Sequence, residues 1–564
     1  MKKIFLLFFI SALSINLFSQ EALKSTEEEY YDFLSLQGLT DRQYLNYRTL
    51  SDSVWVINNE QHPWEENNIS SDFTLFEPEI KSTNYIISGL NQNVQLKVFG
   101  PEWFNSYNTS TPFGQNDGAL WQGRGYNTSF TTGFSLKAYG FSITIKPQLH
   151  YSQNLHYDIM PVSGNNPYKY FYGSIDAPQR FGNKSLIGFD FADSEIRFTW
   201  RALTVGFGTQ SIWLGPAHEN ALLHSNHAAS YPKFDAGIKR TSIIIPGLNW
   251  NLGEIEARMW IGYLSESDFF DTDESNNHNQ IVGYTVSYSP PFLKTLTLGI
   301  NKVCVTKWND PNHLKYLNPF FKQNTLNTKF GEDQKASFTA SWLFEKVGLE
   351  IYGEIGLDDF LSDGLALYGY ARYPFHTITY TVGLKEAFPI SKKNQVYGLI
   401  NFEWNHTEMS QDYQMWGAYN FGFHHQITQG YTNKGQWLGS GIGYGGNSQK
   451  LTFTLYHKLG YGKLYIGRNN PDNSYIYQMC VTQNENEVAH KYFTAFKANF
   501  YVGIDTLFFI QKSFSISAGF MYNLVINPLY NPGYSFISTN GLKAYREYTY
   551  LHNFRFEWAI KYYF

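Results

Sequence analysis

The sequence predicts an all-β protein, a large antiparallel transmembrane β-barrel with a small helical segment before it. Three observations favour this fold class. The last eleven residues alternate between large apolar and mostly polar side chains, the mean hydropathy is −0.36 although aromatic residues are abundant, and the N-terminus has the pattern of an export signal. A barrel places its lipid contacts at alternate positions, so its mean hydropathy stays polar even in a membrane.

The segment from Phe554 to Phe564 is predicted to be the closing strand of the barrel. Successive side chains of a strand point to opposite faces, so the even positions form an apolar face and the odd positions carry Arg555, Glu557 and Lys561. Eleven residues is the length of a tilted strand that crosses a bilayer, and aromatic residues near both ends suit interfacial girdles. The alternative for this segment is an edge strand of an ordinary β-sandwich.

Composition excludes several classes of protein. Aromatic residues make up 18 % of the chain and charged residues 16 %, and 46 glycines against 20 prolines suit many strands joined by turns. A net charge of −5 gives no basic patch, so we expect no nucleic-acid partner. Two cysteines, Cys304 and Cys480, leave one long-range disulfide open. We expect no cofactor and no resident metal.

The N-terminus predicts export. Residues 1–20 combine Met1-Lys2-Lys3 with an apolar run from Ile4 to Phe18 and a polar end, which is typical of a secretory signal peptide cleaved after Ser19 or Gln20. No later segment has the roughly 18 apolar residues that a spanning helix requires. Export then leaves two destinations, secretion or insertion as a barrel, and the strand pattern favours the outer membrane.

Residues 21–112 are predicted to be a periplasmic lead-in, partly helical and partly irregular. Ser25 or Thr26 followed by Glu27-Glu28-Glu29 is a helix start, and Gly38 ends the helix. Its apolar residues need cover, so we expect it to pack beneath the periplasmic mouth. Four prolines make the rest irregular, apart from a strand-like pattern at Val94-Leu96-Val98.

Residues 113–564 are predicted to form the barrel. Polar connections of very unequal length separate the strand patterns, as a membrane barrel with short turns on one side and long loops on the other requires. About 450 residues at roughly 25 per strand and connection give about sixteen to eighteen strands, a width that needs an internal plug or holds water. The alternating sets are Phe130–Leu136, Phe141–Ile145, Ile196–Trp200, Leu203–Phe207, Ile255–Tyr263, Val282–Tyr288, Leu296–Ile300, Ala336–Phe344, Leu349–Ile355, Ile378–Leu384, Val396–Trp404, Leu451–Leu455 and Phe514–Phe520.

One loop lacks this alternation and carries several reactive side chains. The stretch Trp213–His227 contains His218, Glu219, Asn220, His224, Ser225 and Asn226. Four interpretations stay open. His218, His224 and His227 with Glu219 could bind a metal, although the spacing is not that of a zincin, and Ser225 could be a nucleophile, although no Gly-x-Ser-x-Gly elbow surrounds it. The loop could instead be a polar plug that satisfies backbone groups in the lumen, or it could recognise a sugar with Trp213 stacking on a ring.

Further candidates lie elsewhere in the predicted barrel. Trp121 and Arg124 stand between glycines, where Arg124 could reach a ligand carboxylate or form a luminal ion pair. Glu350, Glu354, Asp358 and Asp359 form an acidic strip for which luminal ion pairs are the favoured account. The aromatic stretches Tyr168–Tyr172 and Tyr530–Phe536 suit either stacking on sugars or insertion at lipid headgroups.

Several of these stretches together resemble the capsule-assembly Wzi family. Trp213-Leu214-Gly215-Pro216 followed by Ser225-Asn226-His227-Ala228 is similar to its Trp-Gly-Pro…Ser-Asn-Asn-Ala signature. Further similar blocks, in the order expected for the family, are Asn116–Gly125, Tyr352–Gly356 with Asp358-Asp359, Glu403–Thr407 and Gly430–Gly435. Leu34–Gly38 and Tyr47–Leu50 resemble its N-terminal helical region. Leu214, Ala217-His218-Glu219 and His227 depart from the family's pattern.

The resemblance implies a monomeric, plugged, eighteen-stranded outer-membrane barrel that acts as a lectin and not as an enzyme. Such a protein binds exported capsular or extracellular polysaccharide and holds it at the cell surface, among outer-membrane lipids and with docking of polysaccharide export machinery left open. The alternatives are a diffusion porin and a barrel hydrolase. The residues expected in the polysaccharide-binding or luminal motif are Trp121, Arg124, Trp213, His218, Glu219, Asn220, Asn226, Glu354, Asp358, Asp359, Glu403 and Tyr431.

Overall fold

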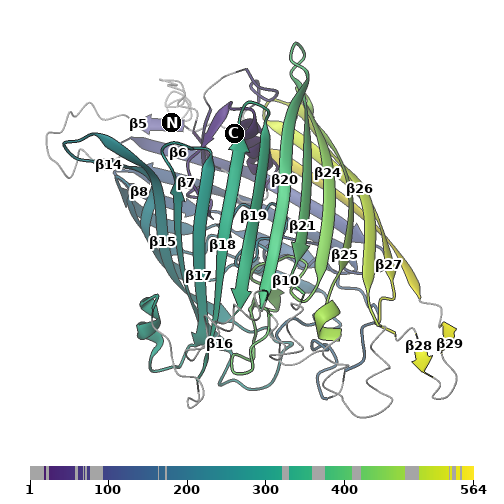
Figure 1. Cartoon of the computed structure of the whole chain (residues 1–564). Helices are drawn as coiled ribbons and strands as arrows, with labels where there is room; N and C mark the ends of the chain where they lie inside the picture. The colour runs from purple at the N-terminus through teal and green to yellow at the C-terminus, as the bar shows by residue number, and fades with distance from the viewer. Residues whose placement is uncertain are drawn as a thin grey trace, which may run out of the picture.

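The protein is described by a computed structural model, which confirms the predicted fold class. It describes residues 18–20, 25–57, 61–67, 69, 73–76, 90, 93–162, 164–171, 175–320, 330–358, 375, 377–408, 421–476, 495–531, 534–536, 542–545 and 549–564. The strands form one closed antiparallel sheet (Figure 1). Among the described residues this barrel has eighteen strands, since β8 with β9 and β10 with β11 are interrupted strands and β5 is a short addition. No described helix is long and apolar enough to span a membrane.

The barrel strands run in chain order around the wall. They are β5 (Phe73–Phe76), β6 (Val94–Asn108), β7 (Gly125–Ala138), β8 (Phe141–Ile145), β9 (Gln148–Ser152), β10 (Leu186–Asp190), β11 (Glu195–Trp200), β12 (Leu203–Gly208), β14 (Lys233–Ile245), β15 (Trp250–Ser265), β16 (His278–Ser289), β17 (Leu296–Lys307), β18 (Glu332–Phe344), β19 (Leu349–Asp358), β20 (Ile378–Ser391), β21 (Val396–His406), β24 (Asn447–His457), β25 (Gly460–Asn470), β26 (Ala498–Gln511), β27 (Phe514–Ile526) and β30 (Tyr550–Tyr562).

Smaller elements accompany the barrel. They are α1 (Thr26–Leu36), the 3-10 helix η2 (His313–Leu317), β1 (Phe18–Gln20), β2 (Thr40–Arg42), β3 (Tyr47–Arg48), β4 (Val54–Ile57), β13 (Trp213–Leu214), β22 (Thr432–Asn433), β23 (Gln436–Trp437), β28 (Tyr534–Phe536) and β29 (Leu542–Tyr545). β1 pairs with β4, and residues 1–17 lie outside the described part. The signal peptide over residues 1–20 therefore stays a prediction.

The C-terminal strand closes the barrel, as its sequence pattern predicts. β30 pairs with β27 along its length and with β6 from Glu102 to Asn108. The barrel therefore begins at Val94, and the expected boundary at residue 113 is wrong by one strand. The alternation of β6 is broken because its register with β7 shifts between Phe99 and Glu102, around a proline that has no N–H for the ladder. Gly100 lies at this shift, where a Cβ would come within 1.3 Å of the Tyr562 carbonyl oxygen.

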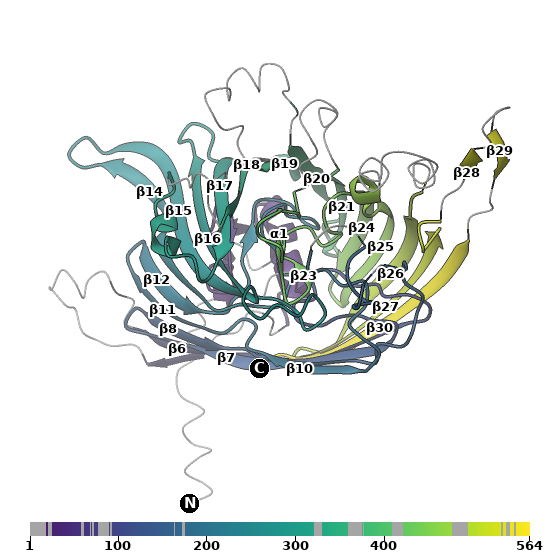
Figure 2. The same ribbon diagram turned by 90° about the horizontal axis from the view of Figure 1, so that it is seen from below.

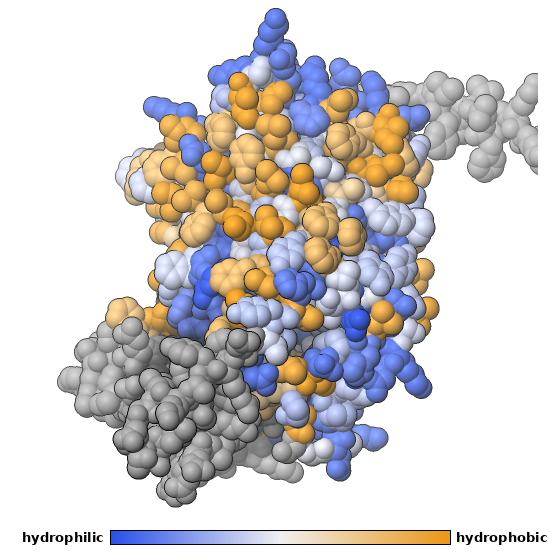
Figure 3. All heavy atoms as spheres, turned by 90° about the vertical axis from the view of Figure 1, so that its right-hand side faces the viewer, coloured by the Kyte–Doolittle hydropathy of each residue, from blue (hydrophilic) through white to orange (hydrophobic). Residues whose placement is uncertain are grey.

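The two ends of the barrel differ. Short turns such as 246–249, 345–348 and 392–395 lie at one end, whereas connections such as 153–185, 209–232 and 407–446 lie at the other. Outer-membrane barrels have short periplasmic turns and long extracellular loops. On the face of the outer wall that Figure 3 shows, apolar side chains gather in a broad region below a hydrophilic end and above a more polar one.

The predicted helical segment lies inside the barrel at the short-turn end. Ser25 caps α1, its hydroxyl accepting the Glu28 N–H at 3.1 Å. Glu27 accepts a hydrogen bond from the Tyr563 hydroxyl at 2.7 Å, and Asp32 forms an ion pair with Lys385 of β20 at 2.7 Å. Figure 2 shows α1 within the ring of strands. The helix is therefore part of the luminal filling and not a separate layer beneath the mouth.

Several charged side chains of the inner wall form ion pairs with other wall residues or with the N-terminal segment. Arg258 contacts Asp235 and Asp52 at 2.9 and 2.7 Å. Glu350 binds Arg42 at 2.6 Å, and Asp358 binds Lys335 at 2.7 Å, as the favoured account of the acidic strip predicts. Glu350 and Asp358 therefore have structural partners, whereas Asp359 lies outside the described residues. A disulfide between Cys304 and Cys480, which the sequence allows, is not tested, because Cys480 also lies outside the described residues.

Candidate functional site

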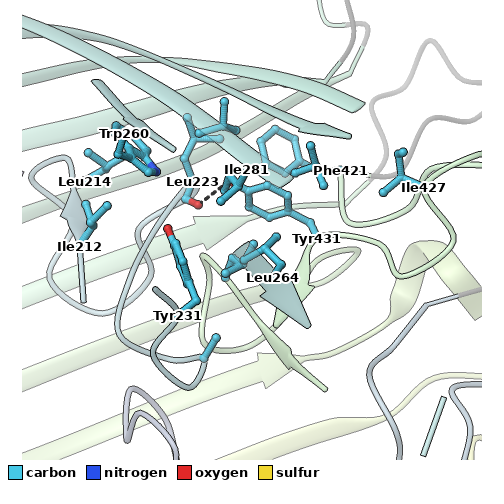
Figure 4. Close-up of a cluster of buried hydrophobic side chains, with 14 of the residues drawn as sticks. Ile212, Leu214, Leu223, Tyr231, Trp260, Leu264, Ile281, Phe421, Ile427 and Tyr431 are labelled. Carbon is cyan, nitrogen blue, oxygen red and sulfur yellow. Dashed lines mark hydrogen bonds between the residues drawn. The ribbon is translucent and has the colours of Figure 1, made fainter. Parts of the chain in front are cut away.

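Two segments fold into the lumen, and we call them the plug: residues 209–232, between β12 and β14, and residues 421–446, between β21 and β24. Their apolar side chains pack against the inner wall (Figure 4). Leu223 and Tyr431 of the plug lie in one cluster with Trp260 and Ile281 of β15 and β16, all fully buried. The Tyr431 hydroxyl donates to the Leu223 carbonyl at 2.8 Å, so the two plug segments also hold each other.

Two wall carboxylates bind the backbone of the first plug segment. Glu403 of β21 accepts the N–H groups of His218, Glu219 and Asn220 at 2.6, 3.0 and 2.8 Å. Glu354 of β19 accepts the Leu222 N–H at 2.9 Å. A carboxylate satisfies several N–H groups in one place, and such charge-assisted bonds are stronger than neutral ones. Glu403 and Glu354 therefore fix the path of the segment that carries most of the candidate residues.

The remaining candidates of this loop are largely enclosed. Trp213 is 1 % exposed and its indole N–H donates to the Ala217 carbonyl at 2.8 Å. Asn220 is also buried, whereas His218 and Glu219 border a luminal cavity of about 230 Å³. Asn226 borders a second luminal cavity of about 350 Å³. In this arrangement Trp213 does not reach a surface on which a ligand could stack.

Three of the side chains considered for metal binding or nucleophilic chemistry, His224, His227 and Ser225, have separate partners, whereas His218 contacts Glu219 at 3.3 Å. His224 contacts the Tyr231 hydroxyl at 2.6 Å, and burial lowers its pKa to about 4. His227 accepts the Asn116 N–H at 3.2 Å, and burial lowers its pKa to about 4 as well. The Ser225 hydroxyl donates to the Gly439 carbonyl at 2.6 Å. No group of three or more potential metal-ligating side chains occurs among the described residues.

The plug also holds the loop that joins β6 to β7. Gln115 donates from its side chain to the Glu219 carbonyl at 3.0 Å and to the Asn220 side chain at 2.9 Å. Further along this loop, the Gly118 N–H donates to the Asn226 carbonyl at 2.9 Å. The Trp213–His227 motif thus positions residues 109–124, which separate the luminal cavities from the long-loop end of the barrel.

A larger cavity of about 680 Å³ lies at the long-loop end, and we call it the mouth cavity. Trp121 and Arg124, which the sequence singles out, line it together with side chains of the other long loops. It has aromatic, amide, hydroxyl and charged lining groups. Its lining residues include Trp121, Arg124, His156, Tyr157, Tyr170, Phe171, Gln179, Trp437, Asp472, Lys497 and Tyr530.

A carboxylate joins three loops around the mouth cavity. Asp472, just after β25, accepts hydrogen bonds from the Tyr170 hydroxyl at 2.5 Å and from the Tyr530 hydroxyl. Burial raises the pKa of Asp472, while the two tyrosines and Lys497 oppose that rise. Lys497 lies 5.8 Å from the centre of the Tyr530 ring, and burial lowers its pKa, opposed by Asp472. These contacts hold aromatic rings in fixed positions at the cavity wall.

Hydrogen bonds and ring contacts also hold the cavity wall near Trp121. Arg124 donates to the Thr109 carbonyl at 3.0 Å and to the His156 carbonyl, so it binds loop backbone, and it forms no ion pair with any residue in the described part of the chain. The Trp121 ring lies 4.9 Å from the Phe181 ring. Fixed rings beside amides and charged groups suit a flat polyhydroxylated ring, whose apolar face stacks while its hydroxyls form hydrogen bonds.

Some of the residues that line the mouth cavity could be predicted from the sequence. The aromatic stretches Tyr168–Tyr172 and Tyr530–Phe536 supply Tyr170, Phe171 and Tyr530, although the rings of Tyr170 and Tyr530 are only 6 % and 4 % exposed. Tyr172 and the side chains of Tyr534 and Phe536 lie outside the described residues. Gln179, Trp437, Asp472 and Lys497 carry no local signal, because only the folding together of distant loops brings them to one cavity.

Comparison with known proteins places the chain in a family. Residues 105–464 match the family of the capsule assembly protein Wzi. No curated protein sequence matches the chain. Among solved structures, the chain is similar to Wzi from Escherichia coli, described as an outer membrane protein involved in group 1 capsule assembly and a carbohydrate binding beta-barrel. That similarity has 13 % sequence identity and a TM-score of 0.53, covering 83 % of this chain and 85 % of that one.

Two other solved structures are more distant from this chain. OccAB1 from Acinetobacter baumannii has 8 % identity and a TM-score of 0.36, covering 85 % of this chain and 98 % of that one. OpdK from Pseudomonas aeruginosa has 10 % identity and a TM-score of 0.36, covering 83 % and 98 %. The family match extends over more than half of the sequence and agrees with the eighteen-stranded barrel described above. The chain therefore belongs to the Wzi capsule-assembly family and is a protein of the outer membrane.

Proposed function

We propose that this protein binds an exported capsular or extracellular polysaccharide in the mouth cavity and holds it at the cell surface as a monomeric, non-enzymatic lectin. The observation that carries the proposal is the mouth cavity itself, about 680 Å³ at the long-loop end, with Trp121, Tyr157 and Trp437 among its lining residues. The carbohydrate binding stated for the Escherichia coli protein of the same family supports it. Docking of polysaccharide export proteins at the short-turn end is part of the same proposal.

The mouth cavity suits this role better than the lumen does. It lies among the long loops, which face the outside of the cell in outer-membrane barrels. The luminal candidates Glu354, Glu403 and Tyr431 instead bind plug backbone. We assign them a structural role, in which they fix the plug and, through it, the loop that carries Trp121 and Arg124.

The test is polysaccharide binding by purified protein in detergent. Trp121→Ala removes one lining ring, and we expect its affinity for the producing cell's polysaccharide to fall about tenfold, or about 1.4 kcal/mol. Trp250→Ala is the matched control, because Trp250 is 62 % exposed at a short turn outside the cavity. Equal affinities of both variants and the unaltered protein would contradict the assignment of the mouth cavity. Failure of the unaltered protein to bind would contradict the proposed function.

The two alternatives make different predictions. A diffusion porin needs a continuous water path, whereas residues 109–124 and the plug lie between the mouth cavity and the luminal cavities. We therefore expect very low conductance in planar bilayers. A hydrolase built on Ser225 would need an activated hydroxyl, but this hydroxyl donates to a backbone carbonyl and is 2 % exposed.

A further inference from the structure

The lipid-facing side of the barrel changes from apolar to partly polar along β16 and β17. Near the short-turn end, Val286 and Ile300 are 50 % and 56 % exposed, as lipid-facing residues are. The same faces then continue toward the long-loop end with Gln280 on β16 and Lys302 on β17. A lysine on the lipid face destabilises a barrel most at the bilayer midplane and less near the interface. These polar side chains therefore need cover or partners.

The loop after β17 supplies that cover by folding back over the outer wall. Three outward side chains donate to its backbone carbonyls at three-residue intervals. Gln280 donates to the carbonyl of His313 at 3.0 Å, Tyr284 to that of Tyr316 at 2.9 Å, and Lys302 to that of Pro319 at 2.6 Å.

Apolar packing holds the same segment to the wall. Tyr316 of η2 is 2 % exposed and packs against Val282 and Cys304, which are 0 % and 5 % exposed although they lie on the lipid-facing side. Residues 308–320 thus replace lipid over this part of the wall. We call them the outer flap.

Three large apolar side chains of the outer flap are exposed, beside the polar residues Asn309, Lys315 and Asn318. Phe320 is 91 % exposed, Leu314 is 64 % exposed and Trp308 is 46 % exposed. The Trp308 ring packs edge-on against Tyr263 of β15, 4.7 Å away. Since the flap lies on the wall that faces lipid, its exposed side is continuous with the membrane-contacting surface.

We propose that the outer flap is an interfacial anchor that inserts Leu314 and Phe320 into the bilayer leaflet at the long-loop end. Insertion removes these two large apolar side chains from water, which favours the anchored position. Trp308 and the exposed Lys315 are residue types that favour the boundary between acyl chains and headgroups. The anchor fixes the height of the barrel in the membrane, and with it the height of the mouth cavity above the lipid. It does not depend on polysaccharide binding.

The experiment measures the depth of a nitroxide label in bilayers. Phe320→Cys is labelled in full-length protein that carries Cys304→Ala and Cys480→Ala, and the protein is reconstituted into vesicles of equal parts phosphatidylcholine and phosphatidylglycerol. Collision rates with oxygen, which concentrates in the bilayer, are compared with those of a water-soluble nickel chelate. Glu274→Cys, in the exposed loop between β15 and β16, is the aqueous control, and Ile300→Cys is the lipid control.

We expect the oxygen-to-nickel ratio at position 320 to approach that at position 300 and to exceed that at position 274 several-fold. Leu314→Cys gives a second labelled site and should behave in the same way. A ratio at positions 320 and 314 equal to that at position 274 would overturn the proposal. In that case the surface faces water and would suit a protein partner.

Discussion

Removal of the Glu403 carboxylate should detach the plug from the wall while the barrel stays closed. Glu403→Ala leaves three N–H groups, those of His218, Glu219 and Asn220, without their acceptor. Each buried unsatisfied group costs about 1–3 kcal/mol, and water entering the lumen recovers part of that. We therefore expect the free energy that holds the segment closed to fall by about 3–6 kcal/mol.

Hydrogen exchange measures this effect directly. Local opening that becomes easier by about 3–6 kcal/mol speeds exchange of the affected amides by about 10²- to 10⁴-fold. The acceleration should be confined to amides of residues 218–222 and their neighbours, because the wall hydrogen bonds are untouched. Single-channel conductance should rise as well, since the loosened segment borders the luminal cavities.

The matched control is Glu254→Ala. Glu254 is also a carboxylate on a barrel strand, but it is paired with Arg240 at 2.6 Å and makes no contact with the plug segment in the described residues. Its removal should leave exchange of residues 218–222 unchanged. Equal exchange rates in the two variants would refute the account of Glu403 as the residue that holds the plug.

Three further predictions test other parts of the account. Burial lowers the pKa of His227 from 6.5 to about 4, so the stability that its neutral ring contributes is present above pH 6.5 and is lost as pH falls toward 4. His227→Gln should therefore make the melting temperature depend less on pH across that range. An unchanged pH profile would argue against the buried neutral ring. Tyr170→Phe removes one hydrogen bond to Asp472, so the loops around the mouth cavity should become about 1–2 kcal/mol easier to open, read as faster proteolysis of those loops; unchanged cleavage would count against the Asp472 contacts. Ile504→Arg places a charge on a side chain that is 45 % exposed on the outer wall and should destabilise the folded barrel by about 2–4 kcal/mol in urea titrations in lipid, whereas a neutral result would contradict the lipid-facing assignment.

The barrel could be predicted because the sequence of each strand alternates according to the surroundings of its two faces. Alternation in segments such as Phe554–Phe564 follows from two faces in different solvents, and this is a local property of the sequence. The helix start at Ser25 is local in the same way. Only the start of β6 could be predicted, at Val94-Leu96-Val98, because a register shift interrupts its alternation at Gly100 and Pro101. Its place in the barrel could not be predicted, because the strand pairs with the far end of the chain.

The candidate site could be predicted only in part. The Trp213–His227 loop stands out because it lacks alternation, yet its partner Glu403 lies 185 residues from His218. Nothing in a single sequence states that the loop binds a wall carboxylate and that the cavity forms elsewhere. Lys497 and Asp472 reach the mouth cavity through loops whose meeting depends on the closed barrel, so their role follows from topology.

The most direct measurement is a structure of the protein with an oligosaccharide cut from the producing cell's own polysaccharide. The account predicts sugar rings in the mouth cavity, with Trp121 or Trp437 against one ring face and Gln179 or Arg124 within hydrogen-bond distance of its oxygens. Sugar bound at any other surface, or a mouth cavity that stays empty at saturating oligosaccharide, would contradict it.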